Sequence, residues 1–325
     1  MTPATAPRLV ADIGGTNARF ALQHDGRIDR MQVLACAEFA TLGDAVRHYL
    51  QGHGVQVRHA ALGIANPVHG DRLRMTNHHW EFSIDALRRE LGLDTLLVLN
   101  DFATLALALP LLPAQELRQV GGAEPEADAP RAVVGAGTGL GVAGLLPARR
   151  GTWLPVAGEG GHVSFSPADD DEAELWRFAR RRHGHVSAER LLCGRGLELI
   201  HAWLCERDGA AGEARDAATI TQRALGGEDA RCARAVDMFC GMLGTLAGNV
   251  ALTFDARGGL YVGGGIVPRL GEHFARSPFR ARFEAKGRFA TALARIPVLV
   301  IHSPWPGLLG AGAALRQHLG EPSHA

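Results

Sequence analysis

Two stretches of the chain join short apolar runs through clustered glycines, and they constrain the fold more than any other feature. VADIGGTNARFALQ covers residues 10–23, and VVGAGTGLGVAGLL covers residues 133–146. Each has an apolar run of strand length, a Gly/Thr turn and a second apolar run, which predicts two strands joined by a tight turn. Few residues are identical between the two stretches, so the pattern indicates two similarly built halves and leaves internal duplication open.

The first half has the pattern of a mixed α/β domain. Strand-like segments at 8–15, 18–23 and 31–37 predict an antiparallel meander. After them we expect a helix over 39–50, a strand over 59–65, a small hairpin near 68–75, a helix from an N-cap at Ser83 through Leu91, a strand over 95–100, and a helix that Pro110 ends.

The second half begins with the other glycine-rich hairpin and then becomes helical. We expect helices over 171–182, after a cap at Ser187, from Leu197, and over 229–252, with strands in GLYVGGG (259–265) and IPVLVI (296–301). A last helix at 308–319 needs an apolar face to pack on. We expect it to pack back on the first half, which gives a small α/β lobe of residues 1–110 plus 303–320 and a large α/β lobe of residues 111–302.

Composition narrows the class of partner. The chain has 34 Lys plus Arg against 34 Asp plus Glu, so it lacks the basic field that nucleic acid or an anionic membrane requires. The five cysteines show neither CxxC nor zinc-finger spacing, which is typical of reduced thiols in the cytoplasm. The opening residues lack the apolar region of a signal peptide. The longest uncharged stretch, 132–148, contains five glycines and a proline, so it is a poor membrane span. We expect a soluble protein that binds a small molecule.

The turn in DIGGTN (12–17) is a candidate anion site. Consecutive glycines expose backbone N–H groups without a Cβ in the way, which suits a phosphate. Asp12 beside phosphates makes chemical sense only if Mg²⁺ lies between them. The segment is neither a Walker A loop nor a dinucleotide-binding GxGxxG. An ordinary glycine hairpin explains the same letters equally well.

Two further glycine clusters lie in the second half. GAGTGLG (135–141) is similar in kind to the first turn, and GLYVGGGIVPR (259–269) places glycines where a strand passes into a helix. Two phosphate-binding turns suit a nucleoside triphosphate, and the exposed backbone of the third cluster suits its nucleoside. A tight strand-to-helix turn is the competing interpretation of that third cluster.

The run LVLNDFATLALALP (97–110) carries Asn100 and Asp101 between apolar residues. Burying a carboxylate is costly unless it is paired, so Asp101 either belongs to a core ion pair or has a functional role. The strand-to-helix pattern places it at the carboxyl end of a strand, where ligands of α/β proteins bind.

Acids and a histidine also gather in GEGGHVSF (158–165) and GHVSAER (184–190). Glu159 and His162 lie in a glycine-rich, non-helical segment, and Glu189 follows in the second motif. Such a set can bind several sugar hydroxyls, because carboxylates accept hydrogen bonds and histidine donates them. A solvated histidine is the simpler alternative, and zinc is the less supported one. TNHHW (76–80) is another polar and aromatic loop that could line a ligand site.

Together these segments resemble the bacterial glucokinases of the proteobacterial type, which are relatives of the ROK sugar kinases and of hexokinase. The resemblance runs from Leu9 to about Leu319 and rests on segments that follow the family's order: LVADIGGTNARFAL, MTNHHW, LNDF, GGAEP, GAGTGLGVA, GEGGHVSF, GHVSAER, GGIVPR, KGRF and PGLLGAGA. The chain departs from ROK members in lacking their cysteine-rich zinc motif, so we expect no structural zinc.

The resemblance implies an actin-like, ribonuclease H-like ATPase fold with two α/β lobes and a cleft between them. It implies a homodimer that transfers phosphate from ATP, with Mg²⁺, to O6 of glucose. By motif, Asp101 is the general base and Asn100, Asp101, Glu159, His162 and Glu189 hold the sugar. The nucleotide contacts implied are Ala11, Asp12, Ile13, Gly14, Gly15 and Thr16 in the first loop, Gly137 and Thr138 in the second, and Gly264 and Gly265 in the third, with Asp12 holding Mg²⁺ through water.

Two other functions fit parts of the pattern. A sugar-sensing regulator could keep this fold without the chemistry, but the few residues before the first strand and the zero net charge do not suggest a DNA-binding domain. A kinase for another hexose, such as fructose or an amino sugar, would share every catalytic part, and the sequence does not reveal the shape of the sugar pocket.

Overall fold

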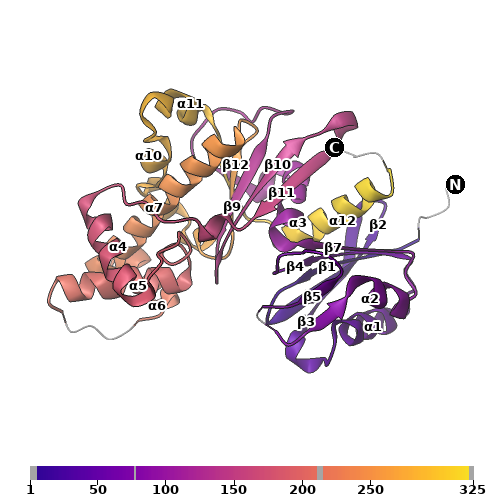
Figure 1. The fold of residues 1–325 in the computed structure, drawn as a ribbon. Coiled ribbons are helices and arrows are strands. Elements are labelled where there is room, and N and C mark those ends of the chain that lie inside the picture. The colour runs from indigo at the N-terminus through magenta and orange to yellow at the C-terminus, as the bar shows by residue number, and fades with distance from the viewer. Residues whose placement is uncertain (1–5, 77, 211–214, 322–325) are drawn as a thin grey trace. The chain divides into compact units, whose positions relative to one another are not determined.

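The structure is a computed structural model that describes residues 6–76, 78–210 and 215–321. The chain divides into two compact α/β units (Figure 1). The first comprises the chain up to Pro113, the segment Leu145–Ala157 and the chain from Ser303 onward. The second comprises Ala114–Gly144 and Gly158–His302.

The sheet of the first unit has the strand order β3-β2-β1-β4-β7. Its strands are β1 (Arg8–Ile13), β2 (Asn17–His24), β3 (Arg27–Ala35), β4 (His59–Ile64) and β7 (Thr95–Asn100). The first three form the predicted antiparallel meander, and β4 and β7 run parallel to β1. The carboxyl ends of β1, β4 and β7 therefore meet at one edge of the sheet.

Helices cover both faces of this sheet. Figure 1 shows α1 (Leu42–His53) and α2 (Ile84–Glu90) over one face, and α3 (Asp101–Ala108) and α12 (Pro306–His318) over the other. Ser83 caps α2 as predicted, since its hydroxyl accepts a hydrogen bond from the backbone N–H of Ala86. The small hairpin is formed by β5 (Arg72–Arg74) and β6 (Glu81–Ser83), and 3₁₀ turns occupy Cys36–Glu38, Leu109–Leu111 and Ala114–Glu116.

The side chains of β1 show why both faces are covered. Leu9, Ala11 and Ile13 point into the core beneath α1, whereas Val10 packs with Leu308 of α12. All of these side chains are fully buried. A strand with apolar residues on both sides must be covered on both faces, and α12 provides the second cover.

The sheet of the second unit has the order β11-β10-β9-β12-β13-β8. The strands are β8 (Leu117–Gln119), β9 (Arg131–Ala136), β10 (Leu140–Pro147), β11 (Trp153–Gly158), β12 (Leu260–Gly263) and β13 (Val298–Ile301), and the unit boundaries fall within β10 and β11. Strands β9, β12 and β13 are parallel. The carboxyl ends of β9 and β12 therefore also lie at one edge.

The helices of the second unit include four longer ones, α4 (Asp170–His183), α5 (Gly194–Arg207), α6 (Ala217–Leu225) and α7 (Ala230–Phe254). Shorter ones follow β12: α8 (Val267–Leu270), α9 (Glu272–Arg276), α10 (Phe279–Glu284) and α11 (Ala290–Arg295), with 3₁₀ turns at Gly160–His162 and Gly287–Phe289. The 3₁₀ turn Arg149–Gly151 belongs to the first unit, and Ala114–Glu116 belongs to the second.

The predicted helix after Ser187 is wrong. Ser187 forms an isolated bridge with Ser164, and the next two backbone N–H groups donate to the carbonyls of Val163 and Gly161 at 2.9 and 2.8 Å. The segment thus pairs with the chain around residue 162, and α5 begins only at Gly194. This pairing places Glu189 next to the other acid-rich motif.

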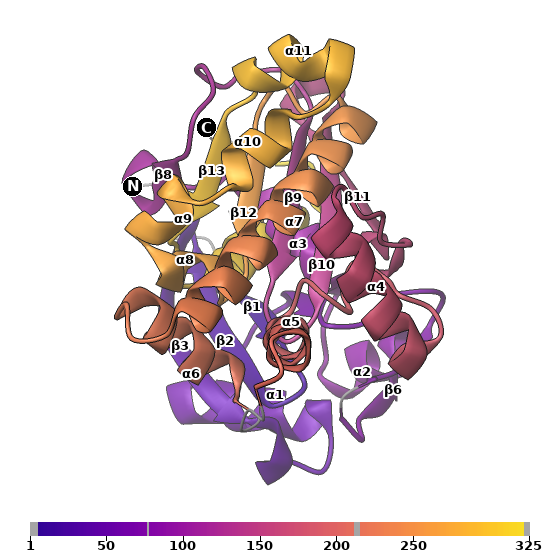
Figure 2. The same cartoon turned by 90° about the vertical axis from the view of Figure 1, so that its left-hand side faces the viewer.

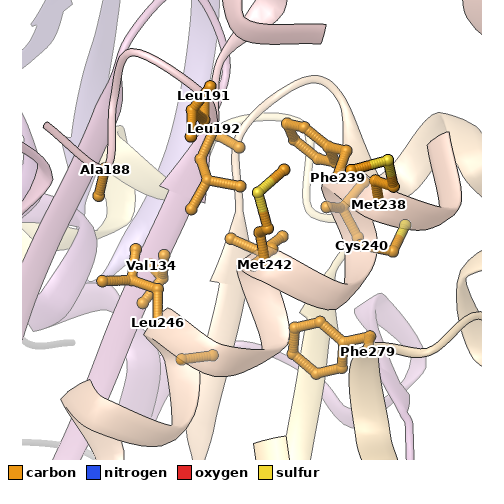
Figure 3. Close-up of a cluster of buried hydrophobic side chains, with 14 of the residues drawn as sticks. Val134, Ala188, Leu191, Leu192, Met238, Phe239, Cys240, Met242, Leu246 and Phe279 are labelled. Carbon is orange, nitrogen blue, oxygen red and sulfur yellow. The ribbon is translucent and has the colours of Figure 1, made fainter. Parts of the chain in front are cut away.

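Helix α7 forms the centre of the second core. Figure 2 shows it lying across the sheet in front of β9 and β12, and Figure 3 shows Met242 and Leu246 near Val134 of β9, and Phe279 beside the same helix. A Cβ at Gly244 would lie 2.2 Å from the carbonyl oxygen of Phe279, so glycine allows α10 to pack this closely. By length and composition α7 could cross a membrane, but 78% of its most apolar window is buried, which is typical of a core helix.

Candidate functional site

In the first unit, the predicted residues gather at the carboxyl edge of the sheet. Ile13 at the end of β1 pairs with Ile64 at the end of β4, and Ile64 pairs in turn with Asn100 at the end of β7. The backbone N–H of Ala65 donates to the carbonyl of Ile13 at 3.0 Å, which continues the contact beyond the strands. The turn after β1 and the start of α3 therefore belong to one edge, where parallel α/β sheets bind ligands.

Asn100 marks the change from strand to helix. Its side-chain oxygen accepts hydrogen bonds from the N–H groups of Phe102 and Ala103 at 2.9 and 3.3 Å, which makes it the N-cap of α3. Its amide nitrogen donates to the Asp101 carboxylate at 3.0 Å and to the carbonyl oxygen of Asn66 at 3.3 Å. The apolar run thus stops at Asn100 and Asp101 because a capping residue ends the strand and starts the helix.

The Asp101 carboxylate is held at the first position of α3. Its Oδ1 accepts the hydrogen bond from Asn100 and a second one from the N–H of Phe102 at 2.9 Å. A negative charge is favourable at this end of a helix. Asp101 is half-buried, and this structure gives the carboxylate a fixed orientation at the sheet edge.

Asp12 lies near the same edge in β1. Its Oδ2 accepts a hydrogen bond from the Arg19 guanidinium at 3.1 Å, and Arg19 lies over the Trp305 ring at 5.5 Å from its centroid. Burial raises the pKa of the Asp12 carboxyl, and the opposing effect of Arg19 is smaller. A carboxylate is the oxygen ligand that Mg²⁺ takes from proteins, and one or two of them suffice because the ion keeps several waters. Sequence reasoning gave neither Arg19 nor Trp305 a role, because Arg19 lies in the strand after the glycine turn and Trp305 is distant in the sequence, so no local pattern marks them as partners.

The turn after β1 is closed by a backbone hydrogen bond. The N–H of Gly14 donates to the carbonyl of Asn17 at 3.0 Å, and neither Gly14 nor Gly15 has a positive φ. The glycines here therefore contribute by lacking side chains. Ala11 and Ile13 are fully buried, so only their backbone groups could contact a nucleotide, whereas Thr16 is exposed.

In the second unit, the predicted glycines of two loops lie side by side. A Cβ at Gly137, after β9, would lie 3.9 Å from the backbone nitrogen of Gly265, after β12. Gly264 has φ +83°, and a Cβ there would lie 2.2 Å from the carbonyl oxygen of Ala136. Glycine is therefore required at 264 for both conformation and space. Gly137, Thr138, Gly264 and Gly265 share one edge of this sheet.

The start of α5 joins this edge. The N–H of Gly194 donates to the carbonyl of Gly137 at 2.9 Å, so the first turn of α5 begins beside the Gly137 loop. The positive end of a helix dipole favours anions. The sequence did not identify this helix start, since we expected the helix to begin at Leu197.

The structure brings the predicted acids and histidine of the second unit together. His162 Nε2 lies 3.9 Å from Glu159 Oε2 and 4.0 Å from Glu189 Oε1. The Glu189 carboxylate also accepts a hydrogen bond from the N–H of Leu140 at 2.9 Å. The side chains of Glu159 and His162 are more than half exposed. The set combines two carboxylate acceptors with an imidazole, which matches the hydroxyls of a sugar.

The TNHHW loop has an apolar anchor. Trp80 is buried and its indole N–H donates to the carbonyl of Phe39 at 3.1 Å, while His79 contacts the carbonyl of Ala40 at 3.1 Å. Asn77 lies outside the described residues. Thr76 donates hydrogen bonds to Asn66, a residue that lies outside the motifs named from the sequence.

One group of side chains in the described part of the chain has the composition of a metal site. The ligand atoms of His201, Asp229 and Cys232 lie within 4.8 Å of one another. The Arg215 guanidinium donates hydrogen bonds to both Asp229 and the Cys232 sulfur, the latter at 3.3 Å. The protein thus supplies the positive charge that such a group would otherwise take from a metal ion.

Comparisons with known proteins agree on one family. The family model described as glucokinase matches residues 9–318. A glucokinase of Chromobacterium violaceum is 56% identical over 98% of this chain and 91% of its own length. A glucokinase of Ralstonia nicotianae is 58% identical over 95% of each chain.

Solved structures extend the likeness to the fold. The crystal structure of a glucokinase from an Antarctic psychrotroph superimposes with a TM-score of 0.88 at 33% identity, covering 96% of this chain and 99% of the other. A ROK family glucokinase from Streptomyces griseus, in complex with glucose and AMPPNP, superimposes with a TM-score of 0.64 at 21% identity, covering 96% and 100%. The fold is the actin-like ATPase fold that the sequence predicted.

Proposed function

The chain belongs to the glucokinase family of hexokinase-type phosphotransferases, and we propose that it transfers the γ-phosphoryl group of ATP to O6 of glucose with Asp101 as general base. The observation that carries this assignment is the position of Asp101: a carboxylate fixed by Asn100 and Phe102 where β7 passes into α3. Phosphoryl transfer requires positioning, charge neutralisation and a base for the attacking hydroxyl.

Asp101 accepts the proton of the 6-hydroxyl as that oxygen attacks the γ-phosphorus. The bond between the γ-phosphorus and the bridging oxygen of ADP breaks, and the products are glucose 6-phosphate, ADP and a proton. A negative charge is favourable at the start of a helix, where Asp101 lies.

For the sugar we propose contacts with Glu159, His162 and Glu189 in the second unit, and with Asn100 and Asp101 in the first. The distances from His162 to the two glutamates, 3.9 and 4.0 Å, leave each carboxylate close to the imidazole without a direct hydrogen bond to it. Carboxylates that each bind one sugar hydroxyl select strongly between sugars. A sugar that lacks one of these hydroxyls leaves a desolvated carboxylate without a partner.

We assign the phosphates to the glycine loops, where the absence of side chains lets a phosphate approach the backbone. The loop residues are Ala11 to Thr16 in the first unit, and Gly137, Thr138, Gly264 and Gly265 in the second. When bound, Mg²⁺ neutralises the charge of the phosphates. Asp12 would hold it through water. Burial raises the pKa of the Asp12 carboxyl, and the Arg19 guanidinium offsets only part of this effect.

The resemblance to the same family also suggests a compartment and an oligomeric state. We propose that the protein is a cytoplasmic homodimer. All five cysteines are free and buried, which agrees with a reducing compartment.

A coupled assay of the purified protein, across a panel of hexoses and phosphoryl donors, tests this function. We expect glucose with ATP to give the highest kcat/KM, and chelation of Mg²⁺ to abolish turnover. A higher kcat/KM for fructose or an amino sugar would show a different hexose kinase. Sequence-specific DNA binding without turnover of any hexose would show a regulator.

A further inference from the structure

Asn66 connects two segments at the carboxyl edge of the first sheet. It lies two residues beyond β4, and its side-chain oxygen accepts hydrogen bonds from the backbone N–H of Thr76 at 2.8 Å and from the Thr76 hydroxyl at 2.5 Å. Its backbone carbonyl accepts the hydrogen bond from the Asn100 amide. Asn66 thus ties the loop after β5 to the end of β7.

The Asn100 side chain makes four hydrogen bonds within the protein. Its oxygen caps α3 through Phe102 and Ala103, and its nitrogen donates to Asn66 and Asp101. An amide nitrogen has two N–H groups, so one serves each acceptor. If the Asn66 carbonyl moves, the nitrogen that also orients the Asp101 carboxylate loses one of its two anchors.

We propose that Asn66 and Thr76 are positioning residues for the base, acting through Asn100 on the Asp101 carboxylate. The inference rests on the proposed role of Asp101. The Thr76 hydroxyl and N–H hold the Asn66 side chain, the Asn66 carbonyl holds one N–H of Asn100, and the other N–H of Asn100 holds Asp101 Oδ1. Small displacements of a catalytic group are costly, because the reacting atoms must approach in one geometry.

Thr76→Val tests this chain of contacts with little change of shape. It removes the hydroxyl bond to Asn66 and keeps the backbone one. We expect kcat to fall about 3- to 10-fold, the worth of one neutral hydrogen bond, with the glucose KM changed less than about twofold. Thr76→Ser, which keeps the hydroxyl, should restore kcat. Thr76 is exposed, so the variant should fold, and Thr76→Ala is a second way to remove the hydroxyl.

The kcat of each variant must be calculated per folded molecule, so that partial unfolding is not mistaken for slower turnover. The stoichiometry of glucose binding, measured by calorimetry, gives the concentration of folded molecules. Thr152→Val is the matched control, because Thr152 belongs to the same unit and its hydroxyl donates one hydrogen bond, to the carbonyl of Arg149 at 2.8 Å. We expect its kcat to equal that of the wild type. An equal loss in Thr152→Val and Thr76→Val would contradict the proposal.

A double-mutant cycle separates positioning from a general structural role. In an Asp101→Ala background, measured by single turnover with excess enzyme, Thr76→Val should have no further effect on the rate, since there is no carboxylate left to position. The same fold reduction in both backgrounds, or an unchanged kcat in Thr76→Val, would overturn the inference. Near wild-type turnover by Asp101→Ala alone would instead overturn the assignment of the base.

Discussion

Gly310 of α12 crosses Thr104 of α3 so closely that a Cβ at residue 310 would lie 1.6 Å from the Thr104 carbonyl oxygen. The Thr104 hydroxyl in turn donates to the carbonyl of Asp101 at 2.7 Å. On the other side of α3, a Cβ at Gly63 of β4 would lie 2.7 Å from the Thr104 hydroxyl oxygen. The helix that begins with Asp101 is therefore held between a strand and the C-terminal helix by two glycines.

Gly310→Ala should lower the free energy of unfolding by about 2 kcal/mol or more, because α3 and α12 must separate to admit the methyl group. Gly52→Ala is the matched control: Gly52 lies within α1, and a Cβ there meets nothing within 4 Å. It should stabilise by up to about 1 kcal/mol through helix propensity. Urea unfolding of both variants measures the difference, and equal effects would contradict the close crossing.

Asp101→Ala and Asp101→Asn should lower kcat by roughly 10² to 10⁴, the usual worth of acid–base catalysis, while glucose affinity changes less. Initial rates in a coupled assay and glucose binding by calorimetry give the two quantities separately. Retention of near wild-type kcat in either variant would show that another group accepts the proton.

Gly264→Ala and Gly265→Ala should differ in kind. A Cβ at Gly264 would meet Ala136 and require a positive φ, so this variant should lose about 2 kcal/mol or more of stability along with activity. A Cβ at Gly265 meets nothing within 4 Å. Gly265→Ala should keep the wild-type Tm and raise the KM for ATP if the nucleotide lies there. Unchanged ATP kinetics in Gly265→Ala would remove residue 265 from the nucleotide site.

Glu159→Gln and Glu189→Gln should each raise the glucose KM by roughly 10- to 100-fold, since a hydrogen bond to a charged acceptor contributes about 1.5–3 kcal/mol. Glu189→Ala should also lower stability, because the Leu140 N–H loses its acceptor. Glu159→Ala provides the comparison. Among the residues that the structure describes, no backbone N–H donates a hydrogen bond to the Glu159 side chain, so this variant should keep its stability. A glucose KM that stays at the wild-type value would exclude the acid from the sugar site.

The stability contribution of Asp229 should depend on pH. The hydrogen bond from Arg215, together with the first N–H groups of α7, lowers the pKa of the Asp229 carboxyl below its ordinary value of 3.8. A lowered pKa means that the folded state favours the charged form, so the contribution is full above the unfolded pKa and is lost as the pH falls through the folded one.

Asp229→Asn keeps the helix cap and removes the charge. We expect it to unfold more easily than the wild type by about 1–3 kcal/mol at pH 7, the worth of a charge-assisted hydrogen bond. The difference should stay constant down to about pH 5 and shrink below about pH 4. Urea unfolding of both proteins from pH 7 to pH 3 measures it, and a difference independent of pH would contradict the Arg215 pairing.

The elements whose signals are local could be predicted from the amino-acid sequence. The meander of the first unit, the Ser83 cap, strand β7 and the start of α7 after Asp229 follow from apolar periodicity and capping residues, which act over a few positions. The motifs also identified the family, because their order along the chain is a property of sequence alone.

Contacts between residues far apart in the sequence could not be predicted, because they depend on how the strands and helices pack. The segment at Ser187 has a helix-capping residue, yet its backbone pairs with residues 161 to 164, and this long-range pairing brings Glu189 to His162. Asn66 and Trp305 lie outside the recognised motifs, and Arg19 lies within one but was given no role there. The partners of all three are set by strand register and helix packing. A hydrogen bond between residues 34 positions apart, such as that from Asn100 to Asn66, leaves no local pattern in the sequence, because its geometry arises only when β4 and β7 lie side by side.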